Sequence, residues 1–292
     1  MLERYHAILE GREKARYLKS KENGAFDELL EKAWGMFHHC NLCEHRCNVD
    51  RSRQKGVCGV TKASIATHFM HYGEESFLIP SYTIFFSGCN FKCVYCQNWD
   101  ISQRQAGLYI EPEKMAEYIE KAYERGAKNI NWVGGEPTPN IPYILETLKN
   151  SNVNIPQIWN SNMYLTTEAM ELLKGFVDVY LTDFKYGNDD CAFRLSKIRN
   201  YTNVVERNHE IAYEDAILVI RHLVLPGHVE CCSKPIMEWI SENVPDALVN
   251  IMDQYYPTYR AYEYEGLNRK ISIDEYNEVY RYAKKLGINV IK

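Results

Sequence analysis

The sequence predicts an α/β protein, in which an open barrel of six strands follows a helical and cysteine-rich extension. Two observations lead to this prediction. From Tyr82 onward, short runs of β-branched and aromatic residues alternate with segments of helical periodicity, which is typical of βαβ units and a parallel sheet. About 210 residues follow Thr83, whereas a complete eight-fold TIM barrel needs about 250. We therefore predict a partial (β/α)6 TIM-type barrel.

Composition excludes several classes of protein. The 292 residues have a net charge of −5, with 46% hydrophobic and 25% charged residues, close to the averages for soluble globular proteins. The mild acidity argues against nucleic-acid or anionic-membrane binding. The charged N-terminus lacks the apolar region of a secretory signal, and no stretch has the 18 consecutive apolar residues of a membrane span. We expect a cytoplasmic protein without a membrane partner, in which cysteines stay reduced.

We divide the chain into an extension, residues 1–80, and a barrel, residues 81–292. Residues 1–37 are expected to be helical because apolar residues recur at helical spacing in 26–37. Residues 38–60 hold four cysteines and few apolar runs. This segment is predicted to be a loop whose order does not come from an apolar core.

The barrel elements follow in order. The expected strands are apolar runs at 83–88, 129–135, 155–162, 177–184, 216–225 and 247–253. The expected helices are 111–126, 141–150, 166–175, about 204–214, about 233–243 and 274–286, with a short apolar end at 288–292. An early Pro begins the first of these helices, while a Thr cap and a Gly stop bound the third. In such barrels the site lies at the carboxyl ends of the strands.

Three cysteines come directly after the first barrel strand, at Cys89, Cys93 and Cys96. Structural zinc requires four ligands, whereas three thiolates hold an iron–sulfur cubane with one iron left open for a substrate or cofactor. Gly88 permits close backbone approach, and Tyr95 adds an aromatic face. The alternatives are three ordinary cysteines or part of a zinc ribbon. Spacing, position and open valence together favour a catalytic [4Fe-4S] cluster.

This C-x3-C-x2-C motif, with an aromatic residue before its last cysteine, is similar to the signature of the radical S-adenosylmethionine (SAM) superfamily. The resemblance implies that the open iron binds the amino and carboxylate groups of SAM. It also implies a low-potential electron donor such as flavodoxin or ferredoxin. One-electron reduction would cleave SAM to a 5′-deoxyadenosyl radical, which abstracts hydrogen from a substrate.

Other polar residues lie where the resemblance expects cofactor contacts. Gly134, Gly135 and Glu136 resemble the family's GGE motif for the methionine amino group, although a plain strand-to-helix turn would have the same sequence. Candidates at later strand ends are Asn160, Ser161, Asn162, Asp183, Lys185, Arg221 and His222. Asp183 and Lys185 are expected on one face, where each would need the other or a ligand.

Within the superfamily, the DFK and RHLVLPG segments most resemble pyruvate formate-lyase activating enzymes and related proteins of unknown substrate. The likeness covers about residues 38–290. Asn160 stands where the activases carry an acidic ligand of their monovalent-cation site, so the sequence departs from that ligand set and leaves open whether the cation site exists. It implies a substrate that is either a glycyl-radical-enzyme-type partner or a small molecule.

A second cysteine array consists of Cys40, Cys43, Cys47 and Cys58. Four thiolates suit either structural zinc or an auxiliary iron–sulfur cluster, and a disulfide or free thiols remain as alternatives. Metal binding would explain how a loop so poor in apolar residues becomes ordered. A function of a different class is a zinc-binding docking or nucleic-acid module without radical chemistry, which would need a fourth ligand near Cys89.

Three further cysteines lack ligand spacing and are expected to be small buried side chains: Cys191, Cys231 and Cys232. The segment 254–266 is dense in tyrosine. It could pack at the open end of the barrel, or it could form a substrate-facing wall with Gln254, Tyr256 and Arg260.

Overall fold

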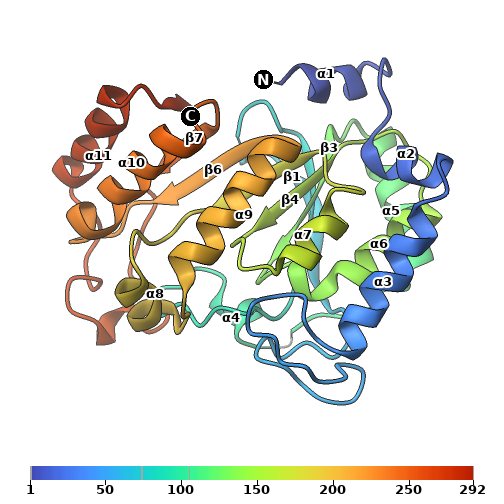
Figure 1. The fold of residues 1–292 in the computed structure, drawn as a ribbon, viewed down its shortest axis with the longest axis horizontal. Helices are drawn as coiled ribbons and strands as arrows, with labels where there is room; N and C mark the ends of the chain where they lie inside the picture. Colours follow the sequence, from blue (N-terminus) through green and yellow to red (C-terminus); the bar gives the residue numbers. More distant parts are fainter. Residues whose placement is uncertain (1, 74, 105, 292) are drawn as a thin grey trace. The chain divides into compact units, whose positions relative to one another are not determined.

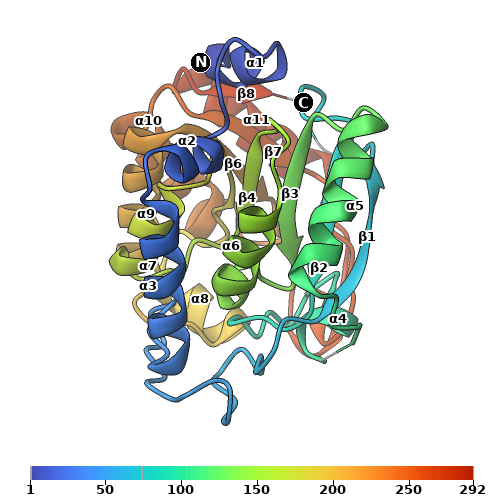
Figure 2. The same ribbon diagram turned by 90° about the vertical axis from the view of Figure 1, so that its right-hand side faces the viewer.

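The computed structural model describes every residue except 1, 74, 105 and 292 (Figures 1 and 2). The chain divides into two compact units. The first contains residues 1–90, 100–161 and 165–180, and the second contains residues 91–99, 162–164 and 181–292. Each unit is described by itself.

The strands form an eight-stranded sheet in which they follow one another in chain order from β1 to β8. β1 pairs with β2 antiparallel, while the β2–β3, β3–β4, β6–β7 and β7–β8 pairs are parallel. All six predicted strands are present, as β2 to β7. The predicted α/β class and partial barrel are therefore confirmed, with one strand added at each end of the order.

The first unit holds the N-terminal helices and the first half of the sheet. Its elements are α1 (Glu3–Leu9), α2 (Arg16–Glu22), α3 (Phe26–His38), β1 (Ile65–His71), β2 (Ser81–Phe86), most of α4 (Trp99–Ser102), α5 (Pro112–Glu124), β3 (Asn129–Gly134), α6 (Ile141–Asn150), β4 (Gln157–Ser161), α7 (Thr167–Leu173) and the start of β5 (Val179–Asp183). Helix α6 packs against both α3 and α5 (Figure 2). As predicted, α5 begins with Pro112, and the side chain of Thr166 caps α7 by accepting from Ala169 N.

The second unit continues from the end of β5. Its elements are α8 (Asp189–Ser196), α9 (Tyr201–Asp215), β6 (Ile217–Leu223), the π-helical turn η2 (Val229–Ser233), α10 (Lys234–Asn243), β7 (Leu248–Met252), α11 (Ile273–Lys285) and β8 (Asn289–Ile291). Helices α10 and α11 pack side by side (Figure 1). Ser272 and Glu275 form a reciprocal capping box that fixes where α11 begins.

The sequence prediction lacked β1, α4 and α8, and it gave β8 only as a short apolar end. β1 lies in the segment assigned to the extension, and its residues are mostly half-exposed, so its pattern is weaker than that of a buried strand. α8 follows a glycine and two polar residues, and its start depends on Asn188, whose side chain accepts from Cys191 N. Among the described residues, no helix has the length and apolar character to cross a bilayer.

Candidate cofactor and metal site

The loop that follows β2 begins in the first unit at Gly88 and Cys89. Gly88 has φ +87°, and a Cβ there would lie 2.4 Å from Val60 Cγ2 and 2.9 Å from the Cys58 carbonyl oxygen. Nε2 of His45 lies 2.8 Å from the Asn90 carbonyl oxygen. The cysteine-rich segment of the extension therefore packs directly against the chain on both sides of Cys89.

The glycine pair at the end of β3 lies against the same loop. A Cβ on Gly135 would stand 2.2 Å from the Gly88 carbonyl oxygen, and one on Gly134 (φ +122°) would stand 2.2 Å from the Phe86 backbone. Side chains cannot occupy either position without moving main chain. The structure thus places Gly135 against the backbone of Gly88, the residue that precedes Cys89, and Gly134 against the backbone of Phe86 at the end of β2.

The third residue of that motif, Glu136, is buried and held from two directions. Its Oε1 accepts hydrogen bonds from Ser161 Oγ at 2.6 Å and from Thr138 Oγ1 at 2.5 Å and N at 3.2 Å. Glu136 and Ser161 were both predicted as site residues, and the structure brings them together, whereas Thr138 was missed. Asn160, which precedes Ser161 on β4, is also buried. Paired donors fix the direction of the Glu136 carboxylate.

The second cysteine array also belongs to the first unit. Cys40, Cys43 and Cys58 are buried, and Cys47 is half-buried. Burial raises the pKa of the Cys40 and Cys43 thiols, and the charges of the other thiols in the array add to this. These thiols therefore favour their neutral form unless a cation lies beside them.

Arg51 supplies one such cation, and it was not among the predicted residues. Its side chain is buried, with 1% of its surface exposed. It donates to the carbonyl oxygens of Val60 at 3.0 Å and Pro139 at 2.8 Å, lies 4.0 Å from Cys40 Sγ, and covers the Phe37 ring at 4.4 Å. A buried guanidinium favours negative charge nearby, and Cys40 is the member of the array that Arg51 approaches.

In the second unit, a chain of hydroxyl groups ends on Cys93. Tyr95 Oη donates to Tyr186 Oη at 2.7 Å, and Ser196 Oγ donates to Cys93 Sγ at 2.9 Å. The hydroxyls of Tyr186 and Ser196 are hydrogen-bonded to each other. Because Ser196 gives its proton to sulfur, Tyr186 is the donor between them. Each donor in such a chain polarises the next, so the last bond favours negative charge on Cys93.

Asp183 and Lys185 form the ion pair expected from their spacing, with Nζ and Oδ2 2.7 Å apart. Burial opposes the charge on Lys185, but Asp183 and Cys93 raise its pKa above the ordinary value. Burial also raises the pKa of Cys93 to about 11, while Lys185 and Ser196 act to lower it. Lys185 is therefore a cation shared between a carboxylate and a predicted cluster ligand.

The remaining predicted residues of the second unit differ in burial and in hydrogen-bond partners. Cys96 is half-buried, and its N–H donates to the Cys93 carbonyl oxygen at 3.3 Å. Asn162 Oδ1 accepts from Tyr164 N at 3.1 Å. Arg221 lies half-buried on β6. The next residue, His222, is buried, with Nδ1 2.8 Å from the Phe184 carbonyl oxygen and Nε2 2.8 Å from Ser233 Oγ. Both nitrogens of His222 are thus used within the unit.

The tyrosine-rich segment contacts the loop that carries Cys93 and Cys96. Arg260 N donates to the Val94 carbonyl oxygen at 2.9 Å, and Gln97 Nε2 donates to the Gln254 carbonyl oxygen at 3.0 Å. Tyr259 stacks on Trp99 with ring centroids 5.4 Å apart. Tyr256 remains 45% exposed. The segment therefore both packs against the cysteine loop and presents aromatic surface beside it.

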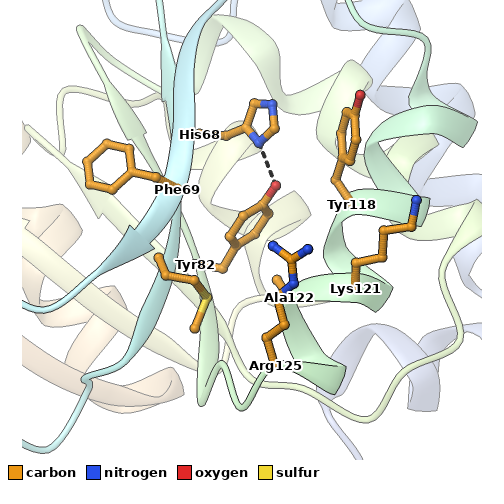
Figure 3. Close-up of a pocket in the computed structure, with 8 residues that line it drawn as sticks. His68, Phe69, Tyr82, Tyr118, Lys121, Ala122 and Arg125 are labelled. Carbon is orange, nitrogen blue, oxygen red and sulfur yellow. Dashed lines mark hydrogen bonds between the residues drawn. The ribbon is translucent and has the colours of Figure 1, made fainter.

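A separate pocket in the first unit lies between β1, β2 and α5 and has a volume of about 480 Å³ (Figure 3). His68 stands at its centre, with Nδ1 2.6 Å from Tyr82 Oη and its ring stacked on Tyr118. Burial lowers the pKa of His68. Lys121 and Arg125 also line the pocket. None of the predicted site residues lies here, so the pocket is distinct from the cysteine loop.

The residues around Cys89 and Cys93 fit an iron–sulfur cluster with SAM. A buried thiol that accepts a hydroxyl hydrogen bond has the setting of a thiolate ligand, and the lack of a Cβ at Gly134 and Gly135 lets the end of β3 pack against the backbone of Phe86 and Gly88, directly before Cys89. Sequence reasoning missed Tyr186, Ser196 and Arg51, which act on the cysteines from distant positions in the chain. Their residue types carry no spacing signal that could have identified them.

Comparison with known proteins agrees with this chemistry. Residues 83–240 match the family model of the radical SAM superfamily. The chain is 47% identical over 272 residues to an uncharacterized protein of Methanocaldococcus jannaschii, covering 91% of this chain and 80% of that protein. It is 24% identical over 159 residues to the pyruvate formate-lyase-activating enzyme of Staphylococcus aureus, which covers 50% of this chain and 62% of the enzyme.

Solved structures share the fold at low sequence identity. A radical SAM methyltransferase from Sphaerobacter thermophilus has a TM-score of 0.52 and 12% identity, with 94% of this chain and 91% of that one covered. Streptococcus suis SuiB bound to S-adenosylmethionine has a TM-score of 0.50 and 16% identity, with 70% and 47% covered. The family model spans more than half of the chain, and family membership implies an iron–sulfur enzyme that cleaves SAM reductively. The chain belongs to the radical SAM superfamily.

Proposed function

We propose that Cys89, Cys93 and Cys96 ligate a [4Fe-4S] cluster whose open iron binds SAM. In this proposal the protein acts in the cytoplasm, where a low-potential electron donor such as flavodoxin or ferredoxin reduces the cluster. When bound, these groups supply reductive cleavage of SAM to a 5′-deoxyadenosyl radical. The observation that carries the proposal is the C-x3-C-x2-C loop, in which Ser196 donates to Cys93 Sγ. That bond supports the role of a thiolate ligand for Cys93.

The other residues position SAM. The Glu136 carboxylate, oriented by Ser161 and Thr138, suits the methionine ammonium, with Gly134 and Gly135 offering main-chain atoms beside it. In this proposal Asn160 adds a polar group in the first unit, and Asn162 and Arg221 add polar groups in the second. His222 does not contact SAM in it, because both of its ring nitrogens already have partners within the second unit. In the second unit, Asp183 and Lys185 present a charge pair next to Cys93. Tyr95 acts through its hydroxyl chain to Cys93 rather than by direct contact.

For the substrate, we propose a peptide segment of a partner protein, from which the radical abstracts a hydrogen atom. The matched relative that acts on a protein, by its name, is the Staphylococcus aureus activating enzyme. The tyrosine-rich segment supports a protein partner, because Tyr256, Tyr259 and Tyr262 are 45%, 38% and 67% exposed beside the cysteine loop. Exposed aromatic side chains are enriched where proteins dock.

The test is anaerobic reconstitution with iron and sulfide, followed by dithionite and SAM. Wild type should release 5′-deoxyadenosine, and Cys93→Ala should release none because two thiolates cannot hold the cubane. Asp183→Asn should bind the same iron but bind SAM less tightly. A colourless protein with zinc and no iron, or full 5′-deoxyadenosine release by Cys93→Ala, would overturn the assignment and favour the zinc-module alternative.

The partner is tested with the same preparation. Deuterium carried by a partner's labelled glycines should enter 5′-deoxyadenosine, whereas labelled small-molecule pools should not supply it. Arg260→Ala and Tyr256→Ala should weaken this transfer without changing cleavage of SAM in the absence of a partner. Transfer from the small-molecule pool alone would contradict the protein-substrate proposal while leaving SAM cleavage intact.

We also propose that Cys40, Cys43, Cys47 and Cys58 hold a second metal centre, either zinc or an auxiliary iron–sulfur cluster. Arg51 supports this, because its buried positive charge matches the net negative charge of four metal-bound thiolates. Arg51→Met should release this metal to a chelator at least about tenfold faster. Arg53→Met, at a side chain that is 86% exposed, is the control. Iron and zinc are measured in wild type and in Cys40→Ser, and the metal that the variant lacks is the one that this array binds.

A further inference from the structure

A third group of soft ligands lies in the second unit, on the two loops that follow β5 and β6. Cys191 is in the first turn of α8, and His228 and Cys231 belong to the turn around η2. His228 and Cys231 have the x2 spacing of a chelating pair, but Cys191 lies 37 residues before His228, so the sequence does not show that the three belong together. The folded chain nevertheless places the three ligand atoms within 4.8 Å of one another.

The sulfur separation matches a tetrahedral ion. Cys191 Sγ and Cys231 Sγ are 3.9 Å apart. Two thiolates that each bind zinc at about 2.3 Å in tetrahedral geometry are separated by about 3.8 Å. Cys232, which is outside this group, has its sulfur 3.9 Å from Cys231 Sγ. The thiols of Cys191 and Cys231 are therefore already spaced as a metal would hold them.

His228 has the orientation of a metal ligand. Its Nδ1 lies 3.0 Å from the Pro226 carbonyl oxygen, and Arg194 donates a hydrogen bond to Nε2 at 2.9 Å. Because Nε2 accepts, the ring proton is on Nδ1 and points at a backbone carbonyl. That second-shell bond is the usual support of a histidine that binds metal through Nε2. Arg194 is thus a competitor for the lone pair that a metal would use.

The two loops that carry these ligands contact each other, and one of the three ligands is exposed to solvent. Asn188 Nδ2 donates to the Cys231 carbonyl oxygen at 2.6 Å, and a Cβ on Gly187 would lie 2.7 Å from the Cys232 carbonyl oxygen. The two loops are therefore in backbone contact. Cys191 and His228 are buried, whereas Cys231 is exposed. An ion can reach the group past Cys231 without the loops opening.

We propose that Cys191 Sγ, Cys231 Sγ and His228 Nε2 bind a soft divalent cation of the zinc class, and that this ion clamps the loops after β5 and β6 together. Thiolate and imidazole ligands select such a cation over magnesium or calcium. The thiols lose their protons on binding, so no oxidant or reductant is involved. This site is separate from both cysteine arrays and requires no cleavage of SAM.

The proposed metal site is connected through α8 to the loop that carries Cys93. Cys191 is near the beginning of this helix, and residues at its end hold the loop. Lys92 N donates to the Ser196 carbonyl oxygen at 3.0 Å, and Val94 N donates to the Leu195 carbonyl oxygen at 2.9 Å. An ion that immobilises the start of α8 would therefore also reduce local opening of the segment that contains Cys93.

The test counts zinc on the full chain after anaerobic loading and gel filtration, with and without prior iron reconstitution. Cys231→Ser and His228→Gln should each bind one equivalent less zinc than wild type. Whatever the other cysteines bind is common to all samples, so the difference reports this site alone. The control His6→Gln, at an exposed position on α1, should match wild type. Equal zinc in wild type and both site variants would overturn the proposal.

Two further measurements separate ligation from a general effect on folding. Zinc should slow hydrogen exchange at the Lys92 and Val94 amides in wild type but not in Cys231→Ser. Arg194→Ala should bind zinc about fivefold to tenfold more tightly because the competing hydrogen bond is gone, while Arg281→Ala on α11 should not. Unchanged exchange together with unchanged affinity in Arg194→Ala would contradict the clamp.

Discussion

The hydroxyl of Ser196 donates a hydrogen bond to the sulfur of Cys93 at 2.9 Å, across 103 residues of sequence. Tyr186 and Tyr95 extend the interaction into a chain of donors that all point toward this sulfur. These hydroxyls favour negative charge on one of the three predicted cluster ligands, against the burial that raises the pKa of its thiol to about 11. Hydrogen bonds to ligand sulfur help set the reduction potential of iron–sulfur clusters.

Ser196→Ala should make the cluster harder to reduce, because the added electron loses a stabilising donor. A net hydrogen-bond contribution of about 0.5–1.5 kcal/mol corresponds to a potential lowered by roughly 20–60 mV. A redox titration followed by electron paramagnetic resonance measures this. Ser241→Ala, whose hydroxyl bonds to the Glu238 carbonyl oxygen on α10, should leave the potential unchanged. An unaltered potential in Ser196→Ala would show that the bond does not act on the cluster.

Glu136→Gln should weaken SAM binding without loss of iron. The neutral amide keeps the size of the side chain but loses the charge that Ser161 and Thr138 orient. A hydrogen bond to a charged group contributes about 1.5–3 kcal/mol, so the dissociation constant should rise by a factor of roughly 10 to 150. Equilibrium dialysis with labelled SAM measures the constant. The control is Glu117→Gln, an exposed carboxylate paired with Lys114 on α5, and a similar loss there would argue against a direct role for Glu136.

Gly135→Ala should destabilise the protein by about 3 kcal/mol, because the new methyl group would overlap the Gly88 carbonyl oxygen and force main chain apart. Gly35 in α3 offers a matched substitution. A Cβ at Gly35 would meet no atom within 4 Å, so Gly35→Ala should stabilise by about 0.5–1 kcal/mol. Urea unfolding of both variants tests the pair. If the two variants had equal free energies of unfolding, the backbone at the end of β3 could move at little cost and would not constrain the loop before Cys89.

Acid should destabilise the fold partly through His222. Burial lowers the pKa of this side chain to about 4, with Lys185 acting in the same direction and the Phe184 carbonyl opposing it. Between pH 6.5 and 4 the unfolded chain binds a proton that the folded chain does not, so stability falls as pH falls through this window. The shift corresponds to about 3 kcal/mol.

His222→Gln retains hydrogen-bonding groups but cannot take up that proton. Its urea midpoint should therefore fall less between pH 7 and pH 4.5 than the midpoint of wild type, whatever its stability at pH 7. A fall as large as that of wild type would assign the acid sensitivity to other groups.

Much of this protein follows from local sequence patterns. Six strands and the helices between them could be predicted because apolar periodicity, the Pro at α5 and the Thr166 cap act over a few residues. The pairing of Asp183 with Lys185 followed from strand alternation. β1 and α8 were missed, since a half-exposed edge strand and a short polar helix have weak patterns of their own.

By itself, the sequence determined the motif of Cys89, Cys93 and Cys96, because these predicted ligands of one cluster lie close together in the chain and their spacing is visible there. Only the tertiary structure decided which distant side chains contact the cysteines, both in this motif and elsewhere in the chain. Arg51 reaches Cys40 and Pro139, Ser196 reaches Cys93, and Cys191 meets His228 and Cys231 through contacts between distant segments. Such contacts depend on how loops pack at strand ends, and a hydroxyl or guanidinium shows no pattern in sequence until the fold brings its partner within hydrogen-bonding distance.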